Sequence, residues 1–173
     1  MIFQNKICTQ IYHSPCGELI LASIGDELYL CDWNEKPCAE RNKRRLKRLL
    51  KADFEEKESE TIRQAAVQLD EYFAEKRKEF DLKLRLVGTD FQKSVWRALM
   101  EIPYSETRSY MQIAERIGNP KGVRAVAQAI GANGLSIIVP CHRVIGANHS
   151  LTGFAGGLEA KRFLLNLEGK FKK

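Results

Sequence analysis

Residues 109–131 carry the clearest structural signals in the chain, in the sequence SYMQIAERIGNPKGVRAVAQAIG. Ser109 followed by Gln112 is a capping-box pattern, which opens a short helix that extends to residue 117. The pair Asn119-Pro120 predicts an N-cap and a first-turn proline for a second helix over residues 120–130. Two helices joined by so short a turn indicate a helix-turn-helix, although helical hairpins without a DNA-binding role share this spacing.

The second of these helices has two distinct faces. We expect Val123, Val126 and Ile130 to lie on one side and to be core. Arg124 and Ala127 are three residues apart and share another face. An arginine beside small residues brings a guanidinium and the backbone close to a nucleic acid, whereas helix geometry alone favours a solvated surface arginine.

The segments on either side complete a mostly helical second half. A second capping-box pattern, Thr89 with Gln92, opens a helix that extends to residue 100. Residues 135–139 are predicted as a short apolar strand that leads into Pro140-Cys141-His142-Arg143. A glycine-rich loop follows, and the last helix is predicted over residues 158–167, with Gly169 as its stop signal.

The first half is predicted to be α/β. Turn signals separate three strands, at residues 7–13, 18–24 and 27–33, which indicates a β-meander. Helices are predicted at 39–51 and 59–76, and alternating apolar residues predict a strand at 80–86. We place a domain boundary at Gly88, which gives an α/β domain of residues 1–87 and a mostly α domain of residues 88–173.

The net charge of +6 is confined to the second half. Residues 1–87 contain 16 Lys and Arg and 16 Asp and Glu, whereas residues 88–173 contain 12 and 6. A polyanionic partner, nucleic acid first, is plausible for the second half, although a merely basic surface has the same balance. The basic run at 41–51 is flanked by acidic residues, and we interpret it as a solvated helix face rather than a DNA contact.

The five cysteines and the N-terminus bear on the compartment. An odd number of cysteines without a secretion signal argues against a disulfide framework. We find no signal peptide and no apolar run long enough to span a bilayer, and we expect a cytosolic protein, or a nuclear one in a eukaryote. The N-terminal Cys8, His13, Cys16, Cys31 and Cys38 lack a Cys-x2-Cys pair, so we expect no zinc site and no cofactor.

Cys141 is the candidate nucleophile. A thiol attacks as the thiolate, so it needs a base or a positive environment, and His142 and Arg143 follow it directly. Adjacent residues in an extended segment point opposite ways, so a turn after Pro140 or a bridging water is needed to connect thiol and imidazole. Glu168 is a candidate to orient the imidazole. A buried, inert thiol is the alternative.

A set of motifs in residues 88–169 resembles the O6-alkylguanine-DNA alkyltransferases, also called methylated-DNA–protein-cysteine methyltransferases. The central motif is Pro140-Cys141-His142-Arg143-Val144-Ile145. The other matches follow in the family's order: GTDFQ at 88–92 with VW at 95–96, IPY at 102–104, SY at 109–110, RAV at 124–126, GGL at 156–158, LL at 164–165 and EG at 168–169. The first half matches the family only in its general layout.

The resemblance implies a fold and a mechanism. The fold would be an N-terminal ribonuclease-H-like α/β domain and a C-terminal winged-helix-like domain. Cys141 would accept the alkyl group once and irreversibly, with His142 as a base acting through a water and Glu168 orienting it. Asn133 would support the active-site turn, and Tyr110 would donate a proton to the departing guanine.

The resemblance also implies how DNA is held. The partner would be double-stranded DNA containing O6-alkylguanine, bound from the minor groove by a monomer, with the damaged base flipped into a pocket. Activity on O4-alkylthymine is left open. The implied pocket residues are Val144, Phe154, Ala155 and Arg143, and the implied DNA-contacting residues are Arg124, which would fill the gap in the base stack, Ala127, Thr89, Gln92 and Ser109.

Five residues depart from the family pattern without removing a proposed catalytic group. Ser105 and His149 stand where the family usually has glycine. Ala127 also replaces a glycine and adds a methyl near the DNA, and Gly134 replaces a common proline. Phe154 stands where tyrosine is common and lacks its hydroxyl.

Three other functions remain as alternatives. A non-enzymatic damage-recognition protein of the same fold would lack the acceptor cysteine, so Cys141 argues against it. A winged-helix regulator would need neither the Pro140–Arg143 motif nor Glu168. A cysteine hydrolase would turn over repeatedly and would leave the basic second half unexplained.

Overall fold

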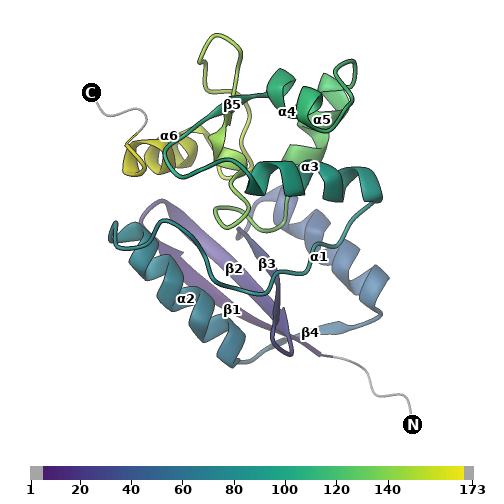
Figure 1. Ribbon diagram of the computed structural model, residues 1–173. Helices are drawn as coiled ribbons and strands as arrows, with labels where there is room; N and C mark the ends of the chain where they lie inside the picture. Colours follow the sequence, from purple (N-terminus) through teal and green to yellow (C-terminus); the bar gives the residue numbers. More distant parts are fainter. Residues whose placement is uncertain (1–5, 170–173) are drawn as a thin grey trace. The chain divides into compact units, whose positions relative to one another are not determined.

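The computed structural model describes residues 6–169, which form two compact units that divide between Val87 and Gly88 (Figure 1). Each unit has its own core and is described by itself. Within the described range, no helix is both long enough and apolar enough to span a bilayer.

The first unit is built on a four-stranded sheet. Its strands are β1 (Lys6–Ser14), β2 (Gly17–Ile24), β3 (Glu27–Trp33) and β4 (Asp53–Glu56), in the spatial order β3-β2-β1-β4. The first three strands form the predicted antiparallel meander, with Tyr12 opposite Leu19 and Leu21 opposite Cys31. β4 runs parallel to β1 at the edge of the sheet.

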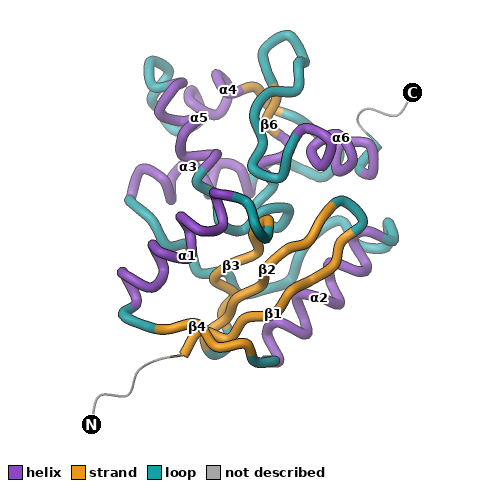
Figure 2. Tube along the Cα trace, turned by 180° about the vertical axis from the view of Figure 1, so that it is seen from behind, coloured by secondary structure: helices purple, strands orange, loops and turns teal. Residues whose placement is uncertain are grey.

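Two helices cover the two faces of this sheet (Figures 1 and 2). Helix α1 (Pro37–Leu50) connects β3 to β4, and its Leu46 joins a core cluster with Ile7, Ile20 and Leu30. Helix α2 (Glu60–Phe73) packs against β1, β2 and β3. Its N-cap residue Ser59 makes a 2.7 Å hydroxyl contact with Ser23 on β2.

The strand predicted at residues 80–86 is wrong in extent. The segment makes one isolated parallel bridge, between Leu28 and Leu84. The Leu28 N–H donates to the Lys83 carbonyl, and the Arg85 N–H donates to the Leu28 carbonyl. The alternating leucines did indicate half-buried extended chain, but only one residue of the edge strand β3 pairs with it. The short strand β4 was not predicted, because its four residues include one apolar side chain, Phe54.

The second unit is mostly helical. It contains α3 (Asp90–Met100), α4 (Tyr110–Arg116), α5 (Val123–Gly131) and α6 (Leu158–Leu167). Both predicted capping boxes are present, at Thr89 and at Ser109. Helix α3 packs on α4 and α5, and the buried Trp96 indole N–H donates to the Ala129 carbonyl at 2.8 Å.

Two predictions in this unit need correction. Helix α5 begins at Val123 rather than at Pro120, because residues 119–122 form a turn in which the Gly122 N–H donates to the Asn119 carbonyl. A side chain at Gly122 would collide with the Asn119 side chain, and this favours glycine there. Residues 135–139 are a turn rather than a strand, since the Val139 N–H donates to the Leu135 carbonyl.

Candidate active site

The turn before Cys141 is held by Asn133. This buried side chain donates from Nδ2 to the Val139 carbonyl and accepts from the Leu135 N–H, both at 2.9 Å. Ile137, at the centre of the turn, has a φ of 72°, which is a strained value for a β-branched residue. The two Asn133 hydrogen bonds and the burial of Ile137 therefore hold a backbone conformation that the local sequence would not adopt by itself.

A single 3-10 turn, η1 (Cys141–Arg143), carries three of the six residues of the central motif. It is closed by the Arg143 N–H, which donates to the Pro140 carbonyl at 3.0 Å. Cys141, His142 and Arg143 are all buried. The chain then enters the two-residue strand β6 (Val144–Ile145), which pairs with β5 (Arg108–Ser109). A turn after Pro140, one of the two ways in which the sequence could connect the thiol to the imidazole, is therefore present.

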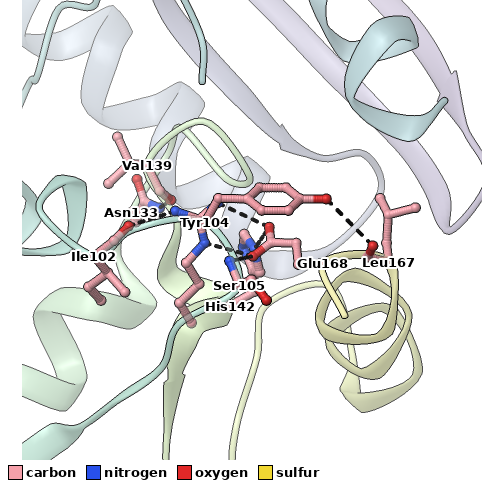
Figure 3. Close-up of polar contacts among 9 residues, drawn as sticks. Ile102, Tyr104, Ser105, Asn133, Val139, His142, Leu167 and Glu168 are labelled. Carbon is pink, nitrogen blue, oxygen red and sulfur yellow. Dashed lines mark hydrogen bonds and ion pairs between the residues drawn. The ribbon is translucent and has the colours of Figure 1, made fainter. Parts of the chain in front are cut away.

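Glu168 connects this turn to the end of α6. Its Oε2 atom lies 2.7 Å from Nε2 of His142, and both side chains are fully shielded from solvent (Figure 3). The other ring nitrogen of His142, Nδ1, is also buried and has no hydrogen-bond partner among the described residues. The carboxylate thus occupies one side of the imidazole and leaves Nδ1 to act on another group.

Arg143 points to the same carboxylate. Its Nε donates to Oε1 of Glu168 at 2.8 Å, and its Nη2 donates to Oε2 at 3.1 Å. Its Nη1 donates to the Ile102 carbonyl at 2.7 Å, and the guanidinium lies over the Tyr104 ring. The resemblance placed Arg143 in the substrate pocket, but its donors are directed at Glu168 and at the segment after α3.

The segment after α3 completes the surroundings of Glu168. The Ser105 N–H donates to Oε1 of Glu168 at 3.3 Å, and the Tyr104 hydroxyl donates to the Leu167 carbonyl at 3.5 Å (Figure 3). Ser105 has a φ of 70°, in the left-handed region that favours glycine. This φ gives a physical reason for the glycine that the family usually has at this position.

Opposing effects set the charge states of Glu168 and His142. Burial would raise the pKa of Glu168, but hydrogen bonds from His142 and Arg143 and the charge of Arg143 outweigh it and hold that pKa well below its usual range. Burial is also the largest influence on His142, and it lowers the pKa of the imidazole despite the neighbouring carboxylate. Since Arg143 is permanently charged, it keeps Glu168 ionised while the imidazole stays neutral at pH 7.

Lys161 is a member of this site that sequence reasoning missed. It lies on α6, seven residues before Glu168, and its side chain is completely buried. Burial lowers the pKa of Lys161 to about 8, an effect opposed by a favourable interaction with the Cys141 sulfur. Its ammonium donates to the Thr152 carbonyl at 2.9 Å, and the Thr152 hydroxyl donates to the Tyr110 hydroxyl at 3.1 Å. The available signal was helical spacing, since Lys161, Leu165 and Glu168 share one face.

Two family models match nearly the whole described chain. Residues 90–170 match the DNA-binding domain of 6-O-methylguanine DNA methyltransferase, and residues 7–86 match its ribonuclease-like domain. A methylated-DNA–protein-cysteine methyltransferase from Methanosarcina acetivorans is 51% identical, over 92% of this chain and 96% of its own length. The chain belongs to the methylated-DNA–protein-cysteine methyltransferase family.

Other members of this methyltransferase family agree in sequence and in structure. The constitutive enzyme of Bacillus subtilis is 48% identical over 90% of this chain and 91% of its own length. The structure of Mycobacterium tuberculosis OGT in complex with DNA superposes with a TM-score of 0.78 at 44% identity, covering 94% of this chain and 92% of that one. The two-domain organisation, a sheet-containing domain followed by a helical DNA-binding domain, is therefore shared.

The remaining positions that the methyltransferase resemblance singled out lie on three segments. Val144 is fully buried on β6, whereas Phe154 and Ala155 are partly buried in the loop between β6 and α6. On α5, Arg124 is exposed and Ala127 is partly exposed, and Val126 and Ile130 on the other face are buried as predicted. Val123 is only partly buried.

The capping residues Thr89, Gln92 and Ser109 have their oxygen atoms engaged in the protein. The hydroxyl oxygens of Thr89 and Ser109 accept from backbone N–H groups, and Oε1 of Gln92 accepts from the Thr89 N–H. A hydroxyl that accepts in this way retains its own hydrogen for donation.

The cysteines of the first unit do not gather at one place. Cys31 and Cys38 are buried, Cys8 and Cys16 are partly buried, and none of these four forms a disulfide. Within residues 6–169, no three His, Cys, Asp or Glu side chains are grouped so that they could hold a metal ion.

Proposed function

We propose that this chain repairs DNA by direct reversal, by transferring the alkyl group of O6-alkylguanine to Sγ of Cys141 in one irreversible turnover. The observation that carries this proposal is the buried Cys141-His142 turn joined to Glu168, with Nδ1 of His142 unengaged among the described residues. The names of the closely similar proteins support the same activity.

In the proposed mechanism, His142 removes the thiol proton through one water at Nδ1. The neutral ring that burial favours is the form able to accept that proton. Glu168 holds Nε2, which fixes the tautomer with the proton on Nε2, and it stabilises the imidazolium that forms.

The transfer step is a displacement at the alkyl carbon. The S–C bond forms as the bond from that carbon to O6 breaks, and the electron pair leaves with the guanine. Protonation of the departing guanine by the Tyr110 hydroxyl makes it a better leaving group. The product is a thioether, which thiol–disulfide exchange cannot reverse, so one molecule of protein repairs one lesion.

Substrate access in this proposal requires base flipping. O6 is out of reach inside a duplex, so the damaged nucleotide rotates into a pocket. The backbone around Val144 and Ala155 would read the guanine edge, with Phe154 at the pocket wall and Asn133 supporting the turn that carries the sulfur. The Lys161–Thr152–Tyr110 connection, from α6 through the loop to α4, would position the proton donor.

DNA would be bound through the α4–α5 pair in the minor groove. Arg124 is exposed on α5 and would fill the space that the flipped base leaves, with Ala127 close to the groove. The Thr89 and Ser109 hydroxyls would donate to phosphates, and Gln92 lies beside Thr89 at the start of α3.

The proposal also includes the fold description of each unit and the cellular location. A parallel β4 added to an antiparallel meander supports the ribonuclease-H-like description of the first unit, and the α3–α5 arrangement supports the winged-helix description of the second. We place the protein in the cytoplasm because the similar proteins come from bacteria and archaea, which keep their DNA there. A monomer stays a prediction from the resemblance.

The test follows the lesion in the DNA. A duplex carrying one O6-methylguanine is incubated with the protein and digested, and the modified nucleoside is quantified. The proposal predicts that the O6-methylguanine nucleoside disappears in proportion to the protein added, and that none disappears with Cys141→Ala. Tight, lesion-specific binding without loss would instead indicate a recognition protein, and sequence-specific binding of undamaged DNA would indicate a winged-helix regulator.

A further inference from the structure

Helix α1 of the first unit carries an unusual set of arginines. Six of its fourteen residues are basic, against the single acidic residue Glu40. Arg41, Arg44, Arg45 and Arg48 follow the spacing i, i+3, i+4, i+7 and therefore form one stripe along the helix. Three of them are exposed, and Arg45 is partly exposed. We call these four residues the arginine stripe.

The acidic residues near α1 are used by lysines instead. Glu40 pairs with Lys43 at 3.1 Å, and Asp53 pairs with Lys47 at 3.4 Å. The arginine stripe makes no ion pair or side-chain hydrogen bond with any described residue. The flanking acids, on which the interpretation as a solvated helix face rested, therefore form no ion pair with the stripe.

The stripe differs from every other arginine in its unit. The remaining three, Arg63, Arg77 and Arg85, each pair with a glutamate. Since residues 1–87 have no net charge, the stripe is a local separation of charge rather than part of a generally basic surface.

Like charges within the stripe act unfavourably on Arg45. Burial of Arg45 and the charges of Arg41 and Arg48 lower the pKa of Arg45. The acidic group behind them is Asp32, which is fully buried and accepts from Asn42 at 2.7 Å. Burial raises the pKa of Asp32, an effect that the hydrogen bond from Asn42 and the charge of Arg41 oppose. A bound polyanion would relieve this repulsion.

We infer that the arginine stripe is a second DNA-binding surface, which contacts the phosphate backbone of double-stranded DNA without reading its sequence. The four positions span roughly 10 Å of helix axis, a length over which a duplex presents about six phosphate charges. Guanidinium groups bind phosphate oxygens in a bidentate geometry and remain charged at all relevant pH values. This inference rests on the proposed function, since DNA is the polyanion that the second unit binds.

The experiment compares two double variants on the same helix. Arg44→Gln with Arg48→Gln removes two charges from the stripe, whereas Lys43→Gln with Lys47→Gln removes two charges that are already paired. Glutamine, lysine and arginine have similar helix propensities, so both variants should keep α1 intact. Affinity for an undamaged duplex several helical turns long is measured by fluorescence anisotropy between about 50 and about 200 mM salt.

The stripe variant is expected to bind roughly tenfold more weakly at about 0.1 M salt, with a salt slope shallower by about 2. The lysine variant is expected to lose much less affinity and to keep a slope near that of the wild type. Equal affinities and slopes for the wild type and the stripe variant would overturn the inference.

Methyl transfer separates this inference from the proposed function. With saturating O6-methylguanine duplex, the stripe variant is expected to transfer at the wild-type rate. If the wild-type protein transfers methyl and the stripe variant binds as the wild type does, the stripe inference alone has failed. If the wild type does not remove the lesion at all, the proposed function has failed.

Discussion

Nε2 of His142 lies 2.7 Å from Oε2 of Glu168, at a place where neither side chain reaches solvent. The same carboxylate accepts two hydrogen bonds from Arg143 and one from the Ser105 backbone. One acidic side chain therefore orients the candidate base and also joins α6, the η1 turn and the segment after α3. Catalysis and folding of the second unit should consequently depend on the same residue.

Replacing Glu168 by Gln should damage both properties. Loss of its charge leaves Arg143 buried without compensation, which should lower the free energy of unfolding by about 3–5 kcal/mol. Loss of the orienting carboxylate should slow methyl transfer by roughly a hundredfold. Urea denaturation and single-turnover kinetics measure the two effects.

The matched control is Glu101→Gln. Glu101 is exposed and accepts two hydrogen bonds from Arg116, just as the buried Glu168 accepts two from Arg143. That change should cost less than about 1 kcal/mol and leave the transfer rate unaltered. Equal losses in the two variants would show that burial of the Glu168 network has no special effect.

Asn133→Ala should destabilise the turn that carries Cys141. Its two buried hydrogen bonds hold residues 135–139, including the strained Ile137. Their loss should lower the free energy of unfolding by about 2–4 kcal/mol and slow transfer. Asn148→Ala, which removes one exposed contact to the Ser150 N–H, serves as the control and should cost under about 1 kcal/mol. Similar losses of free energy of unfolding in Asn133→Ala and Asn148→Ala would contradict the role of the two Asn133 hydrogen bonds.

Lys161 should make stability depend on alkaline pH. Its pKa of about 8 in the folded protein lies below its ordinary value of 10.5. Between these values the unfolded chain binds a proton that the folded chain does not, so the free energy of unfolding should rise with pH across this window. The wild type should therefore gain stability relative to Lys161→Met between about pH 8 and about pH 10.5. A constant difference between the two proteins would show that Lys161 does not titrate there.

The same variant separates function from stability. Methionine removes the charge that must be buried below pH 8, so Lys161→Met should be at least as stable as the wild type at pH 7. It should nevertheless transfer methyl about tenfold more slowly, because the Thr152 carbonyl loses a hydrogen bond to a charged group. Unchanged transfer would remove Lys161 from the account of the site.

Ser105→Gly should stabilise the protein. Glycine adopts the φ of 70° without the steric cost that a Cβ imposes, and part of the gain is offset by its greater freedom in the unfolded chain. We expect an increase of about 0.5–1 kcal/mol in the free energy of unfolding, with the transfer rate retained because the backbone N–H to Glu168 remains. Ser105→Ala keeps the Cβ and should give no gain; equal gains from both variants would exclude backbone strain as the cause.

Local signals predicted much of the fold. The capping boxes at Thr89 and Ser109 specify the starts of α3 and α4 through contacts within four residues, and both are present. The meander was predicted because its turns contain Gly17 and Gly25, both with positive φ. These features depend on neighbouring residues alone.

The errors arose where a side-chain hydrogen bond or a partner in another segment decides the structure. Residues 135–139 are apolar enough for a buried strand, but the Asn133 side chain folds them into a turn. The strand predicted at 80–86 finds a backbone partner only at Leu28. The direction of the Arg143 guanidinium likewise depends on Glu168, 25 residues away in the sequence.

The most direct test of the central claim is the intact mass of the protein after incubation with an excess of duplex that carries O6-methylguanine, followed by peptide mapping. If Cys141 is the alkyl acceptor, the protein gains one methyl group, located on the peptide that contains Cys141, with no further gain when fresh damaged DNA is added. A methyl group on another residue, repeated turnover, or an unchanged mass while the lesion disappears would contradict it.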